Sequence, residues 1–356
     1  MDRRTFLKTA GAAAVAAAGA APAVHAGGRR LWRMVTAWPP GMPILQTGAE
    51  GFARRVSELT GGRLTIQVFA GGELIPPLEV FDAVSQGTVQ CGHGAAYYWA
   101  GKEPAFQWFT SVPFGLNGQG MNTWLYEGGG LELWEKVYAP YNLVPRPCGN
   151  TGVQMGGWFN REIRRLADFK GLKMRIPGLG GRVFARAGGT VVLLPGGEIY
   201  TSLERGVIDA TEWVGPYHDM RMGFHRIAKY YYGPGWHEPG STLELIVHRP
   251  AYEALPADMK AAVDAAAAEA NLRMLAEFEA RNAEALAAIR KEGKVAVRTF
   301  PADLLEALRK LSNETLEEEA GKNPVTRKVH AAFTAFRRRW RAWEELSEGA
   351  YYRSLL

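Results

Sequence analysis

Residues 206–216 of this chain read G-V-I-D-A-T-E-W-V-G-P, and this stretch decides the fold. A glycine typical of a helix end comes first, and the apolar run from Val207 predicts a buried strand. Glu212 and Trp213 stand where the strand runs out, because Pro216 cannot donate a hydrogen bond to a neighbouring strand. Ligands of open α/β sheets bind at the carboxyl ends of strands, so this carboxylate either faces a ligand or lies at a solvated rim.

An earlier segment repeats this pattern and predicts two similar lobes. E-V-F-D-A-V-S-Q-G-T-V-Q, from Glu79, resembles E-I-Y-T-S-L-E-R-G-V-I-D, from Glu198, in its acidic, aliphatic, aromatic and glycine positions. Each block reads as a helix, a glycine stop and a strand. The alternative is a chance similarity between two short segments.

If the repeat is real, His93 corresponds to Glu212 and both strands end at one crevice between the lobes. Aromatic residues there would form an apolar wall with a few polar anchors. The first strand end carries Tyr97, Tyr98 and Trp99, which either line this crevice or pack between the lobes.

Strand and helix patterns alternate along the chain and predict an α/β fold with doubly wound sheets. Residues 257–291 read as a helix of about 50 Å, which is longer than one lobe and would bridge both. We expect a two-lobe architecture of the periplasmic-binding-protein type with a long bridging helix. The expected parts are lobe 1 (27–150), lobe 2 (151–240), a return to lobe 1 (241–256), the bridging helix (257–292) and a C-terminal strand and helices (293–356).

Four polar residues near the predicted junction of the lobes are candidates for a binding site. Asn150 and Gln154 interrupt a glycine-rich segment, where an amide can bind a cation or a carboxylate, or satisfy the backbone. Arg175 lies in a short apolar strand and needs an anion, which is either a ligand carboxylate held in bidentate fashion or Glu212. Glu238, in W-H-E-P-G, is a second acidic candidate.

Residues 1–26 read as a twin-arginine signal peptide. Arg3 and Arg4 precede an alanine-rich stretch, and the small residues before Gly27 suit cleavage there. The apolar stretch is too short to span a membrane. The sequence therefore predicts export to the periplasm, and it leaves open whether the signal peptide is retained as an anchor.

Charge and cysteine content exclude several classes of partner. The 42 basic and 36 acidic residues are interspersed, so no basic stripe predicts nucleic-acid binding. The chain has two cysteines, Cys91 and Cys148, which either pair in an oxidising compartment or remain buried thiols. No cluster of histidines and cysteines predicts a zinc site.

Aromatic residues near the C-terminus follow helical spacing opposite a group of arginines. We expect this stripe to bury against protein, either this chain or a second copy in a homodimer. The arginines are expected to form a solvated face. The stripe consists of Phe333, Phe336, Trp340 and Trp343, and the arginines are Arg337, Arg338, Arg339 and Arg341.

These features together resemble a known family over essentially all of the chain after the signal peptide. The segments F-K-G-L-K-M-R-I-P-G and E-I-Y-T-S-L-E-R-G-V-I-D-A-T-E-W-V-G-P-Y, with the long helix and the exported start, resemble DctP-like proteins. These are the substrate-binding proteins of tripartite ATP-independent periplasmic (TRAP) transporters. The resemblance implies that Arg175 pairs with the carboxylate of the ligand.

One departure from the commonest family pattern points to a subgroup. Binders of sialic acid and C4-dicarboxylates carry an asparagine-containing stretch where this chain has A-T-E-W-V-G-P-Y. This variant resembles proteins that bind 2-oxo or 2-hydroxy monocarboxylates, of the pyruvate or lactate kind, with a metal cation. The resemblance implies a cation held by Gln154, Glu212, the Trp213 carbonyl and Glu238. It also implies an acid held by Arg175, Gln154, Glu212, Tyr98 and Asn150.

The expected function is therefore capture of a small organic acid anion for delivery to the membrane subunits of a TRAP transporter. The implied ligand set consists of oxygen atoms, which favours Na⁺ or Ca²⁺. We expect no catalytic residues. The alternatives are an exported enzyme acting on small organic acids, with Glu212, Arg175 and His93 in acid–base roles, and a docking subunit that binds no ligand.

Overall fold

The computed structural model describes residues 28–355, so the predicted signal peptide lies outside the described part of the chain. A five-stranded sheet in the order β2-β1-β3-β10-β4 forms the centre of one lobe. Strands β2, β1 and β3 are parallel to one another, and β10 is antiparallel to both of its neighbours. The bounds are β1 Arg30–Thr36, β2 Leu64–Phe69, β3 Cys91–Gly94, β4 Leu143–Asn150 and β10 Thr242–His248.

A six-stranded sheet in the order β11-β9-β5-β8-β6-β7 forms the centre of the other lobe. Here β7, β6 and β8 are parallel, and β5 is antiparallel to both β8 and β9. The bounds are β5 Gly157–Phe159, β6 Lys173–Arg175, β7 Thr190–Val192, β8 Ala210–Thr211, β9 Tyr230–Gly233 and β11 Ala296–Thr299.

The two sheets share one topology, which confirms the repeat predicted from the sequence. Three parallel strands come first in each sheet, and an antiparallel strand then separates them from a fifth. The blocks from Glu79 and Glu198 each contain a helix and a glycine stop, and the third parallel strand, β3 or β8, begins directly after each block. The two-lobe α/β expectation is confirmed as well.

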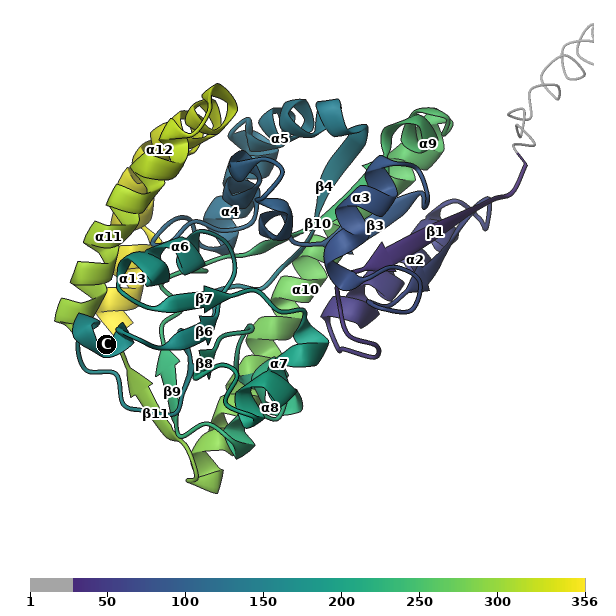
Figure 1. Cartoon of the computed structure of the whole chain (residues 1–356). Coiled ribbons are helices and arrows are strands. Elements are labelled where there is room, and N and C mark those ends of the chain that lie inside the picture. The colour runs from purple at the N-terminus through teal and green to yellow at the C-terminus, as the bar shows by residue number, and fades with distance from the viewer. Residues whose placement is uncertain (1–27, 356) are drawn as a thin grey trace, which may run out of the picture.

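The helices cover the faces of the two sheets and connect the lobes (Figure 1). The α-helices are α2 Leu45–Leu59, α3 Val80–Ser85, α4 Gly118–Glu127, α5 Gly130–Tyr138, α6 Gly178–Arg186, α7 Gly196–Glu204, α8 Pro216–Arg221, α9 Arg249–Glu253, α10 Ala257–Glu292, α11 Ala302–Gly321, α12 Pro324–Leu346 and α13 Glu348–Leu355. Short 3₁₀ helices are η1 Pro77–Glu79, η2 Ala96–Trp99, η3 Pro104–Phe109, η4 Ala139–Tyr141, η5 Leu166–Phe169 and η6 Phe224–Arg226.

The predicted bridging helix is present as α10, which has 36 residues. At 1.5 Å per residue it is about 54 Å long. Asn271 accepts a hydrogen bond from the Gly149 backbone N–H in β4, and Asn282 accepts one from the N–H of Tyr217 in α8. Figure 1 shows α10 running from α9, beside the first sheet, to the far end of the second sheet. The helix thus contacts both lobes along one continuous axis.

Two of the segments that cross between the sheets lie side by side, residues 151–156 and 234–241. The Gln154 N–H donates to the Glu238 carbonyl at 3.1 Å, and the Gly235 N–H donates to the Gln154 carbonyl at 2.7 Å. Thr151 donates to the Ser241 carbonyl at 3.1 Å. Since these bonds join the two crossings to each other, their side chains occupy the junction of the lobes.

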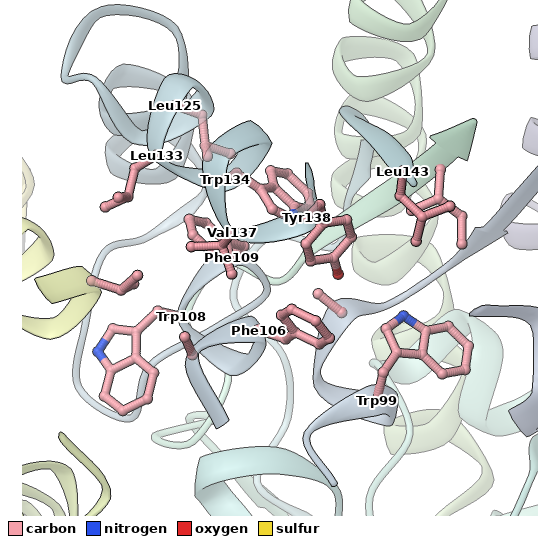
Figure 2. Packing of buried hydrophobic residues seen from close by; sticks show 14 of the residues in the cluster. Trp99, Phe106, Trp108, Phe109, Leu125, Leu133, Trp134, Val137, Tyr138 and Leu143 are labelled. Carbon is pink, nitrogen blue, oxygen red and sulfur yellow. The ribbon is translucent and has the colours of Figure 1, made fainter. Parts of the chain in front are cut away.

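The core of the first lobe is rich in aromatic rings (Figure 2). Phe109 stacks on Trp134 with ring centroids 5.2 Å apart, and on Trp124 at 5.6 Å. Phe333 of α12 meets Trp124 edge-on at 5.0 Å, so the C-terminal region helps to complete this core. Offset and edge-on contacts of this kind add to the stabilisation from burial.

The aromatic stripe of α12 has two different environments. Phe333 and Phe336 are buried in the first lobe and Trp340 packs partly against it, which confirms burial against this chain for that part of the stripe. Trp343, by contrast, is 66% exposed. Arg338, Arg339 and Arg341 are exposed as expected, whereas Arg337 is partly buried.

The structure corrects the predicted strand after Gly206 and decides the state of the two cysteines. The strand after Gly206 is shorter than predicted, because Val207 is 55% exposed and β8 begins only at Ala210. Cys91 and Cys148 are buried free thiols, and burial raises the pKa of both. Among residues 28–355, no helix has the length and apolar composition needed to cross a membrane.

Candidate functional site

Arg175 and Glu212 form an ion pair at the carboxyl ends of two parallel strands. The register of β6 and β8 places Arg175 opposite Thr211, so the next residue, Glu212, lies beside the guanidinium. Nη1 of Arg175 donates to Oε1 of Glu212, and both side chains are 1% exposed. Burial lowers the pKa of Arg175, but the charge of Glu212 and the hydroxyls of Tyr98 and Tyr97 together outweigh this effect and hold the pKa above its ordinary value.

The Arg175 guanidinium keeps N–H groups that other acceptors can use. Its Nε donates to the Leu194 carbonyl at 3.2 Å, and Nη2 lies 3.5 Å from the Tyr98 hydroxyl. Each terminal nitrogen carries two N–H groups, so both retain a donor. The Trp213 ring lies under the guanidinium, 5.1 Å from its carbon, and holds it by a cation–π contact.

A second buried carboxylate, Glu238, lies on the other crossing segment. Its Oε2 accepts hydrogen bonds from Gln154 Nε2 at 2.8 Å and from the Ser241 hydroxyl at 2.5 Å, and the Tyr97 hydroxyl lies 3.5 Å away. Burial, and then the charge of Glu212, raises the pKa of Glu238 to about 7. A positive charge placed beside these two carboxylates would therefore be strongly stabilised.

His237 belongs to this cluster, although the sequence analysis did not select it. Its Nε2 lies 3.3 Å from Oε2 of Glu212. Ligand atoms of Glu212, His237 and Glu238 all lie within 4.8 Å of one another. The position of His237 directly before Glu238 in W-H-E-P-G was the available signal, but adjacent residues often face opposite ways.

These residues fit a hard cation. Oε1 of Gln154 and Oε1 of Glu238 are buried oxygens for which the described residues provide no hydrogen-bond donor. Buried acceptors without donors are unfavourable unless a cation or another donor satisfies them. Carboxylate and amide oxygens are the ligands that Na⁺ and Ca²⁺ prefer, and an oxygen of Glu212 lies within 4.8 Å of one of Glu238.

A small cavity of about 10 Å³ adjoins this cluster between the lobes. A volume of this size accommodates about one water molecule, which is less than an organic acid needs. Its lining comes from both lobes and from the first crossing, and consists of Trp38, Leu45, Tyr97, Tyr98, Thr151, Gln154, Trp213, Val214 and Leu243.

Three residues considered in the sequence analysis lie in other hydrogen-bond networks. The Asn150 amide donates to the Gly240 carbonyl at 3.3 Å and accepts from the Gly152 N–H, so it serves the backbone of the crossings. His93 accepts from the Trp38 indole at 2.7 Å and contacts the Cys148 carbonyl. Burial lowers the pKa of His93 to about 4, so the ring is neutral at pH 7. Trp99 donates to Glu244 and belongs to the lobe core.

Comparison with known protein families shows which family this chain belongs to. The description "Bacterial extracellular solute-binding protein, family 7" (DctP) matches residues 34–323. The chain belongs to the DctP family. A relative from Nostoc sp., named a monocarboxylate 2-oxoacid-binding periplasmic protein, is 48% identical over 320 residues, which cover 90% of this chain and 87% of the relative.

Two solved structures of TRAP periplasmic solute-binding proteins share this DctP architecture. The protein from Colwellia psychrerythraea, with bound calcium and pyruvate, is 42% identical with a TM-score of 0.89. The protein from Pseudoalteromonas atlantica, with bound sodium and pyruvate, is 41% identical with a TM-score of 0.89. Each match covers 92% of this chain and 99% of the other. The predicted membership of the TRAP solute-binding proteins is thus confirmed, and these relatives bind the cations that the sequence analysis expects.

Proposed function

We propose that this DctP protein captures a small 2-oxo or 2-hydroxy monocarboxylate, such as pyruvate or lactate, together with Na⁺ or Ca²⁺. The observation that carries the proposal is the buried cluster at the junction of the lobes. It combines the Arg175–Glu212 ion pair with the unsatisfied oxygens of Gln154 and Glu238. An arginine and an oxygen-lined cation position side by side suit the carboxylate and the adjacent oxygen of such an acid.

In this proposal Arg175 binds the ligand carboxylate through the N–H groups that Glu212, Leu194 and Tyr98 leave available. The ion pair with Glu212 and the Trp213 ring beneath it hold the guanidinium in position. The Tyr98 hydroxyl, whose pKa is raised by burial, stays protonated and can also donate to the acid. Asn150 is not among the residues that contact the acid, but it orders the crossing segment that carries Gln154.

The cation would be held by Gln154, Glu212, Glu238 and the Trp213 carbonyl, and His237 would orient Glu212 through its 3.3 Å contact. When bound, the cation neutralises carboxylates that would otherwise repel the incoming acid. Gln154 and Glu212 are then shared by the cation and the ligand, so the two are expected to bind together.

Closure of the lobes would accompany binding. The lining of the 10 Å³ cavity comes from both lobes, so an acid can enter only when the lobes separate. We place the hinge at residues 151–156 and 234–241, and we propose lobes over residues 27–150 and 151–240 with a return to lobe 1 over residues 241–256. The continuous helix α10 would limit the motion, because it contacts both lobes. Contacts made to both lobes supply the free energy that favours the closed state.

We further propose that the chain is exported by its twin-arginine signal, works in the periplasm and delivers its ligand to TRAP membrane subunits. A homodimer through the C-terminal helices is part of this proposal. The ends of α12 and α13 expose an apolar surface that water disfavours. It consists of Trp343 at 66%, Leu346 at 76%, Tyr351 at 60%, Tyr352 at 61% and Leu355 at 63% exposure.

Calorimetry with pyruvate tests the binding proposal. The mature protein is treated with a chelator, dialysed into sodium-free buffer and titrated before and after addition of Na⁺ or Ca²⁺. We expect binding only after the cation is restored, and full affinity beforehand would contradict the proposal. NMR of the same samples should show pyruvate unchanged over hours, whereas its consumption would favour the alternative of an exported enzyme.

A further inference from the structure

A second pocket of about 450 Å³ lies between α11, α12 and the crossing at residues 234–239. Figure 1 shows α11 and α12 side by side on the flank of the molecule away from α10. The lining of this pocket combines positively charged side chains with flat aromatic rings. We call it the arginine pocket and define it by Arg309, Arg337, Arg341, Phe114, Trp236 and Trp340. None of these residues belongs to the cluster around Arg175.

Arg337 is the unusual member of the arginine pocket. It is partly buried, and its side chain has no hydrogen bond or ion pair with the residues in the range 28–355. Its neighbours do have partners, since Arg341 pairs with Glu345 at 2.8 Å and Arg309 with Glu306 at 3.7 Å. Burial, and then the charges of Arg341 and Arg309, lowers the pKa of Arg337. A partly desolvated guanidinium beside two others is unfavourable until an anion joins it.

The aromatic wall suits a flat group. Phe114 and Trp236 stack with centroids 5.9 Å apart, and the Arg309 guanidinium carbon lies 5.3 Å from the Phe114 ring. Trp340 packs partly against the lobe core and presents the rest of its ring to the pocket. The volume lies within the range of about 300–1,000 Å³ that is typical of small-molecule sites. Since Trp236 and Arg309 already contact Phe114, a planar molecule can contact Trp340 while an acidic substituent reaches Arg337.

We propose that the arginine pocket is a second binding site, for a small aromatic anion whose carboxylate or phosphate group pairs with Arg337. The acidic group lies among the three guanidinium groups, which offer bidentate hydrogen bonds to either kind of oxyanion. The ring lies against Trp340, which is partly exposed, because Trp236 is only 5% exposed. One carboxylate, Glu344, also lines the pocket, and its negative charge limits the negative charge that a bound ligand can carry.

Titration with benzoate and phenyl phosphate tests this site, with benzyl alcohol as the uncharged probe. The mature protein is saturated with pyruvate and Ca²⁺, so that the cluster around Arg175 does not bind the probes. Ligand-observed NMR then gives the dissociation constants. The series is repeated with Arg175→Lys, so that a failure of pyruvate binding is distinguished from a failure of the second site.

Arg337→Gln is the test variant, and Arg338→Gln, which changes the exposed neighbour on α12, is its matched control. We expect saturable binding of at least one anion, at least tenfold weaker in Arg337→Gln and within twofold of wild type in Arg338→Gln. Benzyl alcohol should bind at least tenfold more weakly than that anion. Arg309→Gln provides a second variant on α11 if Arg337→Gln fails to fold. Non-saturable binding in the wild type or equal binding in the test variant would overturn the proposal.

Discussion

Arg175 and Glu212 are 37 residues apart in the chain, yet they form an ion pair in which each side chain is 1% exposed. The parallel register of β6 and β8 creates this contact. Removing one partner of a buried pair leaves an uncompensated charge, which typically costs about 3–5 kcal/mol. Variants that keep the charge therefore test ligand binding more directly than alanine variants do.

Arg175→Lys is expected to weaken pyruvate binding at least tenfold while the protein remains folded. A lysine ammonium can still pair with Glu212, but it lacks the planar fork that binds a second carboxylate in bidentate fashion. Calorimetry at saturating Ca²⁺ measures the effect. The matched control is Arg182→Lys, because Arg182 is 56% exposed and lies outside the cluster. An affinity within twofold of wild type would show that Arg175 is not the anchor.

Glu238→Gln is expected to weaken cation binding strongly, so that pyruvate binding needs more Ca²⁺. Glu238 supplies one of the buried oxygens that lack a donor, and an amide has less negative charge to offer a cation. Pyruvate is titrated at a series of Ca²⁺ concentrations. The Ca²⁺ concentration that gives half of the maximal pyruvate binding should rise at least tenfold. Glu244→Gln is the control, since Glu244 is equally buried but lies in the core of the first lobe. Equal shifts in both variants would mean that general destabilisation is the cause.

Glu244 is expected to make the free energy of unfolding depend on pH. Burial raises its pKa to about 7 from an ordinary value of 4.5, despite hydrogen bonds from Trp99 and Tyr138. Between these two values the folded protein keeps a proton that the unfolded chain releases, so stability falls as pH rises through this range. The loss is on the order of 3 kcal/mol at full effect.

Urea unfolding between pH 4.5 and pH 8 measures this effect by comparing wild type with Glu244→Gln. Other buried carboxylates contribute to both proteins and cancel in the difference. The stability advantage of the wild type at low pH should therefore shrink as the pH rises. Curves that stay parallel over the whole range would show that Glu244 does not titrate there.

Trp343→Glu is expected to convert a dimer into a monomer. A charge on the exposed C-terminal surface would have to be buried in the proposed interface, which is unfavourable. Sedimentation velocity over a range of concentrations measures the change. Leu272→Glu, at a residue of α10 that is 65% exposed, is the control. A wild-type protein that sediments as a monomer would contradict the homodimer. Point variants are preferable to truncation after Lys328, because truncation also removes Phe333 and Phe336 from the lobe core.

The sequence determined the features that depend on local pattern. The order of helices and strands, the glycine stops and the repeat at Glu79 and Glu198 followed from periodicity and turn chemistry, and the structure confirms them. The 36-residue helix α10 was readable because it is long and continuous. Arg175 and Glu212 could be selected because charged residues at the ends of apolar strands need partners.

The tertiary structure decided which of these residues meet. His237 joins Glu212 only because the crossing at residues 234–241 turns it toward the second lobe, and no local pattern encodes that direction. Asn150 and His93 satisfy backbone and indole groups that come from distant parts of the chain. The same holds for α12, where Arg337 faces the arginine pocket while Arg338 faces solvent. Such partners are set by how sheets and helices pack, and the sequence specifies that packing only through the whole fold.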